Sequence, residues 1–536
     1  MLFTVVRLIP GDPMTILLGS VNIVNPELVA RTRAEYNLDA PLPLQYFSWL
    51  GHVLQGDFGR SLWTGEQVSS IVGRRLGPSL LLGLSASVLG LVVGIAWGIA
   101  AGYLSGAGRA VLRNMPMLML VIPTFSIGLL LVFVFAVTLG ILPASGFASP
   151  LEGAEPSVPS AIAHLILPSL ALCLVPASLV ARLTYATVDE IEQEEFIRTA
   201  RALGVPRLRI AIQHSLPNVL LPIITTGGLL ISALITNAVP APAEQLEQVP
   251  VEVPAEPVRL DRAPRLARIA QHWPSLVALG VIALFVLAWL ARDSLTEFSP
   301  SAVRPLRALL PVGAAGSPLG TDGLGRDLFA RLLAGVPFSL LFGAVPAAAG
   351  MVIGAAIGLV AGYAGGRVER VIVSVMDVLL TFPFILLAIL VSAVLGASLQ
   401  NAMIAVTLSI LPKNARLIRS QTLSLKNREF IVASRLAGAG AVPIILRHLL
   451  PNVLPTALIV ASTDVGLMIT LTAGLSFIGL GVQPPDVDWG VLVAEGARYI
   501  TSAPNLAFIP SIVIATVSIA FVVIADTERR ILRSGQ

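Results

Sequence analysis

Long runs of apolar residues alternate with short polar segments along most of this chain. A run of about 18 or more apolar residues can cross a hydrocarbon core of about 30 Å as an α-helix. The runs are continuously apolar, without the alternation of a transmembrane β-strand, and a helix satisfies its own backbone in lipid. Ten spanning segments are predicted, of which 400–412 is the weakest by length: 79–103, 114–139, 161–181, 216–239, 274–291, 337–363, 371–395, 400–412, 449–480 and 505–525.

The composition agrees with this pattern. Apolar residues make up 55% of the chain and charged residues 12%, whereas soluble proteins carry about 25% charged residues. The sequence therefore predicts an all-α polytopic membrane protein with about ten spanning helices.

Basic residues gather in three polar segments, and such residues mark cytoplasmic loops. The segments are therefore expected in the cytosol, and the net charge of +4 follows from membrane topology. With no aromatic–basic module or compact basic domain in the sequence, nucleic acid is not an expected partner. The basic residues are Arg198, Arg201, Arg207 and Arg209; Lys426, Arg428, Arg435 and Arg447; and Arg529, Arg530 and Arg533.

One loop occurs twice. EFIRTARALGVPRLRIAIQHSLPN begins at Glu195, and EFIVASRLAGAGAVPIILRHLLPN begins at Glu429, at an offset of 234 without a gap. Further upstream, Gly102 and Pro123 match Gly362 and Pro383 at an offset of 260, so the duplication covers several helices. Two copies in the same orientation are typical of transporter halves related by an axis along the membrane normal.

Each repeated loop predicts a short helix, a break at glycine and a second short helix, followed by His-x-x-Pro-Asn where the next span begins. Such an element on the cytosolic face can dock a partner and move two spanning helices at once. A basic loop that only sets topology would explain the arginines but not the other shared residues. The candidate docking residues are Glu195, Arg201, Gly204, His214, Pro217 and Asn218, and in the second copy Glu429, Arg435, Gly438, His448, Pro451 and Asn452.

Other candidate chemistry is sparse. Asp464 lies inside an apolar run and is either a polar residue lining a pathway or part of an interhelical hydrogen bond. His214 and His448 have no cysteine or carboxylate at ligand spacing, so no metal site is expected. The sequence carries no motif for nucleophilic or acid–base catalysis, so no catalytic residues are predicted and the chain is not expected to be an enzyme.

Taken together, these features resemble the permease subunits of bacterial ABC importers, in the subgroup for dipeptide, oligopeptide and nickel uptake. The second half carries SPLGTDGLGRDLFARLLAGVPFSLLFG from Ser317 and LSFIGLGVQPPDVDWGVLVAEGARYITSAP from Leu475. The first half carries RLIPGDP from Arg7 and GDFGRSL from Gly56, which are similar to the partner permease of the same systems. The resemblance implies two permeases fused in one chain.

The resemblance also implies an organisation in three parts. Residues 1–239 form a first permease half that lacks the family's first and last spanning helices, 240–272 form a linker rich in Pro, Glu and Arg, and 273–536 form a near-complete second half. Such a protein would be a multi-pass component of the bacterial cytoplasmic membrane. It would carry small peptides, nickel or similar solutes.

The partners follow from the same resemblance. Segments 195–214 and 429–448 would dock cytosolic ABC ATPase subunits, and an extracytoplasmic solute-binding protein would meet the loops around 11–70, 293–334 and 482–503. The sequence contains no Gly-x-x-x-x-Gly-Lys-Ser/Thr, so ATP is expected to be used by the partner subunits, with no cofactor bound by this chain.

Two departures from the family pattern leave alternatives open. The family's motif glutamate is replaced by Arg198 in one copy and Val432 in the other. Five predicted spans separate the two loops, whereas two cytosolic loops require an even number. Either 216–239 is re-entrant, or one candidate does not span, or the chain is an incomplete permease that does not transport. An ion-coupled secondary carrier would need more intramembrane charge than Asp464 supplies.

Overall fold

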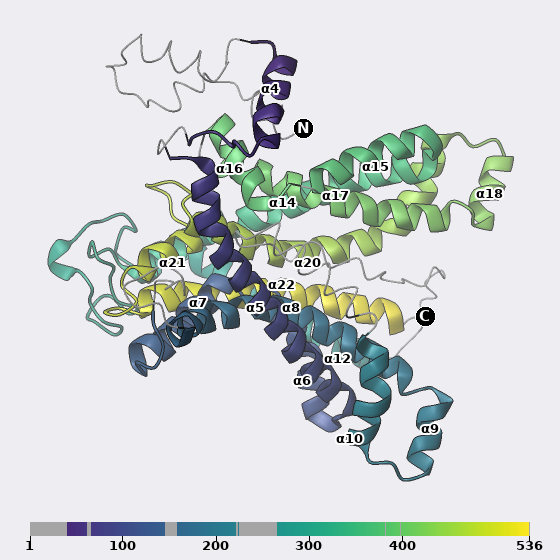
Figure 1. Cartoon of the computed structure of the whole chain (residues 1–536), viewed down its shortest axis with the longest axis horizontal. Coiled ribbons are helices and arrows are strands. Elements are labelled where there is room, and N and C mark those ends of the chain that lie inside the picture. The colour runs from purple at the N-terminus through teal and green to yellow at the C-terminus, as the bar shows by residue number, and fades with distance from the viewer. Residues whose placement is uncertain are drawn as a thin grey trace.

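The computed structural model describes residues 40–61, 66–144, 158–220, 223, 265–380, 382–396 and 398–534. Within these ranges the regular structure is helical, apart from three isolated β-bridges. This agrees with the predicted all-α fold. A short helix, α4 (Leu42–Leu54), precedes the long helices shown in Figure 1.

Six helices in the described ranges are long and apolar enough to cross a membrane. Two further pairs of helices are long and apolar enough only when the two members are taken as one span, and each pair is bent sharply at a proline. The first pair is α6 (Gly106–Met119) with α7 (Thr124–Leu131), which continues into the π-helical turn Val132–Thr138, and its bend is 107°. The second pair is α15 (Gly366–Leu380) with α16 (Phe384–Leu395), and its bend is 86°. Proline lacks an N–H and disfavours helix before it. The six are α5 (Val68–Tyr103), α8 (Val158–Ile191), α12 (Arg265–Leu290), α14 (Leu328–Ala364), α20 (Leu450–Phe477) and α22 (Asn505–Ser534).

Eight of the ten predicted segments thus fall on these helices or bent pairs. Segment 400–412 lies in α17 (Leu399–Leu425), which is too polar to meet the same criterion because Lys413, Arg416 and Arg419 follow in its second half. Segment 216–239 lies outside the described residues beyond Leu220, except for Ile223. The described part of the chain therefore supports six to eight spans.

The duplication is visible in how the helices pack. In α5, glycines at every fourth position face α8, and in α14 the matching glycines face α17. A Cβ at Gly94 would lie 2.6 Å from Val180 Cβ, and a Cβ at Gly354 would lie 2.9 Å from Asn414 Cβ. The positions of matching glycines in α5 and α14 differ by 260, and the positions of the residues that they face in α8 and α17 differ by 234. These are the two offsets found in the sequence. The two halves therefore repeat one packing arrangement, although the exact domain boundaries stay a prediction.

The halves meet where the bent pair α6–α7 lies against α20 and α22. The hydroxyl of Thr470 donates to the carbonyl of Val121 at the bend, over 2.7 Å. Phe125 stacks on Phe477 with ring centroids 4.9 Å apart. Since proline breaks the α6–α7 ladder, a hydroxyl from the other half satisfies a carbonyl that the helix itself does not pair.

Both repeated loops lie at one end of the molecule. Figure 1 shows α9 (Glu195–Ala202) and α18 (Glu429–Leu436) on the same side, where α22 also ends. α12 begins at that end too, since His272 Nδ1 lies 3.4 Å from Glu528 Oε1 near the end of α22. From there α12, α14, the pair α15–α16 and α17 follow one another to the second loop. The predicted span 216–239, on which the odd number of passes depends, lies outside the described residues beyond Leu220, except for Ile223, and stays a prediction.

The opposite end is built around α21 (Trp489–Ala497) and the segment before α14. Asp322 accepts from Arg326 Nε at 2.6 Å and from Arg331 Nη1 at 2.7 Å, and both arginines also contact Glu495. Arg331 is only 4% exposed. This buried ion cluster fixes α21 and the segment before α14 to each other, in a region where the family resemblance predicts a receptor surface.

Asp488 begins α21 and is 2% exposed. Its carboxylate accepts from Ser476 Oγ at 2.5 Å and from the Val491 amide at 2.8 Å. Burial raises the pKa of Asp488 to about 6, and these hydrogen bonds only partly oppose that effect. Because the folded protein binds this proton more tightly than the unfolded chain does, the charged form opposes folding above pH 6 and the penalty falls as the pH drops through 6.

We therefore expect the unfolding free energy to gain on the order of 1 kcal/mol from Asp488 between pH 7.5 and pH 5. Asp488→Asn keeps an acceptor for the Val491 amide and should remove this pH dependence. Unfolding in detergent at several pH values measures it, with Asp486→Asn as the control on the exposed side chain two residues earlier. The same pH profile in wild type and Asp488→Asn would contradict the assignment.

Candidate functional site

Each repeated loop folds as two short helices joined by a turn, as the sequence predicts. The first copy contains α9, α10 (Arg207–Ile210) and a π-helical turn, Ala211–Ser215. The second contains α18, α19 (Ala441–Ile444) and a π-helical turn, Ile445–Leu449. We call these two segments, 195–218 and 429–452, the coupling elements. Glu195 and Glu429 lie in the first turns of α9 and α18, where a negative charge stabilises a helix.

The break in each element is set by glycine. Gly204 and Gly438 have φ of 75° and 84°, in the left-handed region that favours glycine. The next amide then closes the turn, from Val205 to the carbonyl of Ala200 and from Ala439 to that of Ser434, both over 3.1 Å. This is a common way for a helix to end.

At Gly438, alanine should cost about 1 kcal/mol through backbone strain alone, because a Cβ there meets no atom within 4 Å. Gly204→Ala should behave alike in the first element. Amide hydrogen exchange across 429–448 measures the effect as faster exchange. Gly440→Ala is the matched control, since its φ is −71° and a Cβ would be tolerated. Equal exchange in the Gly438 and Gly440 variants would contradict the strain.

The His-x-x-Pro-Asn ends are alike in the two copies. Asn218 Nδ2 donates to the His214 carbonyl over 2.7 Å, and Asn452 Nδ2 donates to the His448 carbonyl over 2.6 Å. Pro217 and Pro451 each lie two residues after the end of the π-helical turn, in the first residues of the next helix, where proline is tolerated. Among the described residues, no group of three His, Cys, Asp or Glu side chains is arranged to hold a metal ion.

Each coupling element has a buried face and an exposed face. Ile197 and Ile431 are fully buried, as are Ile210 and Ile444, and they pack into the cores of their own halves. On the other face, apolar side chains remain exposed. They include Phe196 at 46% and Leu203 at 77%, and Phe430 at 42% and Leu436 at 84%. Apolar side chains grouped on an exposed surface mark a protein contact. The sequence repeat identifies the two phenylalanines but not the leucines, which stand at non-matching positions.

The two exposed faces differ in charge. Three exposed arginines of the first element, at positions 198, 207 and 209, correspond to Val432, Ala441 and Pro443 in the second. The shared arginine also has different contacts. Arg201 forms an ion pair with Glu192, whereas the Arg435 guanidinium lies 5.8 Å from the centre of the Tyr363 ring. One element is therefore basic and the other mainly apolar, at matching places in the fold.

Asp464 lies apart from the coupling elements, on α20, and is completely buried. Its Oδ1 is 3.2 Å from Lys413 Nζ, and its Oδ2 accepts from Asn414 Nδ2 over 3.2 Å. The interhelical bond considered from the sequence is thus present, between α20 and α17. The sequence does not point to Lys413, because the contact joins residues 51 positions apart. A role of Asp464 in lining a pathway stays a prediction.

Comparison with known proteins decides the family. Residues 94–241 and 354–534, more than half of the chain, each match the family described as "binding-protein-dependent transport system inner membrane component". The chain belongs to this family. One match falls in each half, which confirms the predicted fusion of two copies. The family membership and the spanning helices make this chain a multi-pass permease component of the inner membrane.

Three proteins that are similar to this chain are named as permeases of particular transport systems. The nickel transport system permease protein NikC of Escherichia coli K12 is 39% identical over 264 residues, which are 49% of this chain and 94% of NikC. The glutathione transport system permease protein GsiD of Pectobacterium atrosepticum is 41% identical over 39% of this chain and 70% of its own length. The dipeptide transport system permease protein DppC of Alkalihalophilus pseudofirmus is 36% identical over 255 residues, which are 48% of this chain and 84% of DppC. Each relative therefore corresponds to about half of this chain.

Proposed function

We propose that this chain carries small peptides, nickel or similar solutes across the inner membrane, driven by cytosolic ATPase subunits that dock on the two coupling elements. An extracytoplasmic binding protein would deliver the solute at the opposite end. The range of solutes rests on the names of the similar permeases, which transport nickel, glutathione and dipeptides. ATP is hydrolysed on the partner subunits, and this chain supplies the membrane path between its halves.

The observation that carries the proposal is the matched pair of coupling elements. Each is held to its own half by two buried isoleucines and presents exposed apolar side chains at the same end of the molecule. The second element also leads directly into the spanning helix α20. A partner that moves both elements can therefore tilt both halves relative to each other, which is how alternating access works in two-fold transporters.

The test is uptake into proteoliposomes that hold the chain with the ATPase subunits and the binding protein of its own system. We expect a labelled dipeptide, glutathione or Ni²⁺ to accumulate in the proteoliposomes. This accumulation should require ATP on the side of the membrane where the ATPase subunits are bound, and it should continue when an uncoupler is added. Uptake that the uncoupler abolishes while ATP remains would indicate an ion-coupled carrier. Full ATPase association without uptake of any of the three solutes would indicate an incomplete, non-transporting permease.

A further inference from the structure

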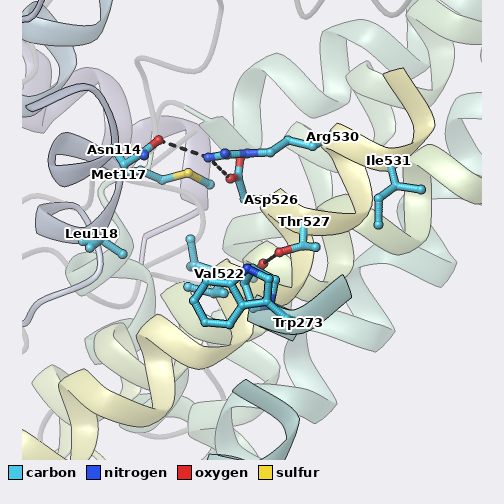
Figure 2. A pocket seen from close by; sticks show the side chains of 11 residues that line it. Asn114, Met117, Leu118, Trp273, Val522, Asp526, Thr527, Arg530 and Ile531 are labelled. Carbon is cyan, nitrogen blue, oxygen red and sulfur yellow. Dashed lines mark hydrogen bonds and ion pairs between the residues drawn. The ribbon is translucent and has the colours of Figure 1, made fainter. Parts of the chain in front are cut away.

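A cavity of about 530 Å³ lies between α6 of the first half and α12 and α22 of the second. Figure 2 shows its walls, which carry apolar side chains such as Met117, Leu118 and Val522. Asn114, Asp526 and Arg530 lie along one edge. The cavity thus has an apolar interior and a charged rim, and it is bounded by both permease halves.

The cavity lies at the end of α22, the end of the molecule where the coupling elements lie (Figure 1), which the proposed function places on the cytosolic side. The two helices of the second half that border it are α12 and α22. Trp273, with 62% of its surface exposed, directly precedes the apolar run of α12, and Arg530 follows the apolar run of α22. Tryptophan and arginine are the residues that gather at this depth, where the hydrocarbon meets the lipid headgroups. The cavity therefore opens at headgroup level rather than into bulk cytosol.

Arg530 connects the two halves across this rim. Its Nη2 donates to Asn114 Oδ1 over 3.0 Å and lies 2.6 Å from Asp526 Oδ2. Both contacts use the same nitrogen of a group that has five N–H donors, and the side chain is 63% exposed.

We propose that this cavity binds one phospholipid of the cytosolic leaflet, with its phosphate on Arg530 and an acyl chain between Met117 and Val522. Contact between water and these apolar walls is unfavourable, whereas an acyl chain can pack against them. Arg530 has further N–H donors besides the nitrogen that contacts Asn114 and Asp526, and a charge-assisted hydrogen bond to a phosphate favours an anionic lipid. Since the site is shared by α6 and α22, the lipid would bridge the two halves.

Quenching of Trp273 fluorescence by brominated lipid tests the site. The purified full-length chain in detergent is titrated with dibromo-phosphatidylglycerol or dibromo-phosphatidylcholine, and the signal of Trp273→Phe is subtracted, because the chain has six tryptophans. We expect saturable quenching of Trp273 by both lipids. Phosphatidylglycerol should bind about fivefold more tightly, the equivalent of about 1 kcal/mol for one arginine contact.

Two variants separate the site from general attraction to a basic surface. Arg530→Gln should remove the preference for phosphatidylglycerol, and Arg530→Lys should keep part of it. Arg370→Gln is the matched control, an exposed arginine at the cytosolic end of α15, and should keep the preference. Inorganic phosphate at equal concentration should not relieve the quenching. No difference in quenching between wild type and Trp273→Phe, an unchanged preference in Arg530→Gln, or displacement by inorganic phosphate would overturn the proposal.

Discussion

Replacing Asp464 by alanine should destabilise the second half by about 3 kcal/mol. The change removes a fully buried carboxylate from Lys413, whose side chain is only 18% exposed, and from the buried amide of Asn414. Removing one partner of a buried ion pair usually costs about 3–5 kcal/mol, because the remaining charge stays in a medium of low dielectric. Unfolding of the purified chain in mixed micelles measures the loss.

A second pair of variants separates the ion pair from simple loss of volume. Lys413→Met combined with Asp464→Leu replaces both charges by apolar side chains of similar size, and it should recover most of the lost stability. Lys413→Met, Asp464→Leu and the double variant form a cycle with wild type whose coupling energy isolates the pair. Equal stability of Asp464→Ala and wild type would show that the contact contributes little. At the matching positions the first half carries Leu179, Val180 and Leu230, so the interaction belongs to the second half alone.

Phe430→Asp should lower ATP-driven uptake at least tenfold while leaving the fold of the chain intact. Phe430 is 42% exposed on the outer face of α18, so a charge there costs little in the free chain. In a complex, the same carboxylate would lie buried and unpaired against the ATPase subunit, which costs several kcal/mol. Phe196→Asp is the matched change in the first element and should act in the same direction.

Co-purification with the ATPase subunits measures this effect directly, beside uptake. The control is Leu306→Asp, which changes a fully exposed apolar side chain in the segment before α14. It should leave ATPase association unchanged. If Phe430→Asp and Leu306→Asp retained the ATPase subunits equally, the outer face of α18 would not be a docking surface.

The sequence predicts the local features well, because each depends on neighbouring residues. Apolar runs mark six to eight spans, and Gly204 and Gly438 mark the turns within the coupling elements. It misses contacts that join distant segments. Thr470 and Val121 meet across 349 positions. The match between the two loops also does not show which residues are exposed. Leu203 and Leu436 do not match each other in the sequence, and only the folded structure shows that both are exposed.

The predicted span 216–239 lies largely outside the described residues and stays a prediction. The bent helix pairs show the same limit of the sequence. The bends at Pro123 and Pro383 are suggested by proline, but their angles follow from packing. In the case of the bent pair α6–α7, the other half contributes both a hydrogen bond and a stacked ring.

The central claim, that both coupling elements face the cytosol and bind ATPase subunits, is tested most directly by cysteine labelling. Arg198→Cys and Val432→Cys are made separately in a Cys173→Ala background, since Cys173 is the single, buried cysteine of the chain. Both positions are exposed at matching places on α9 and α18. We predict that a membrane-impermeant maleimide labels both in inside-out vesicles, neither in right-side-out vesicles, and neither once the ATPase subunits are bound. Labelling of the two positions from opposite faces of the membrane would contradict the account.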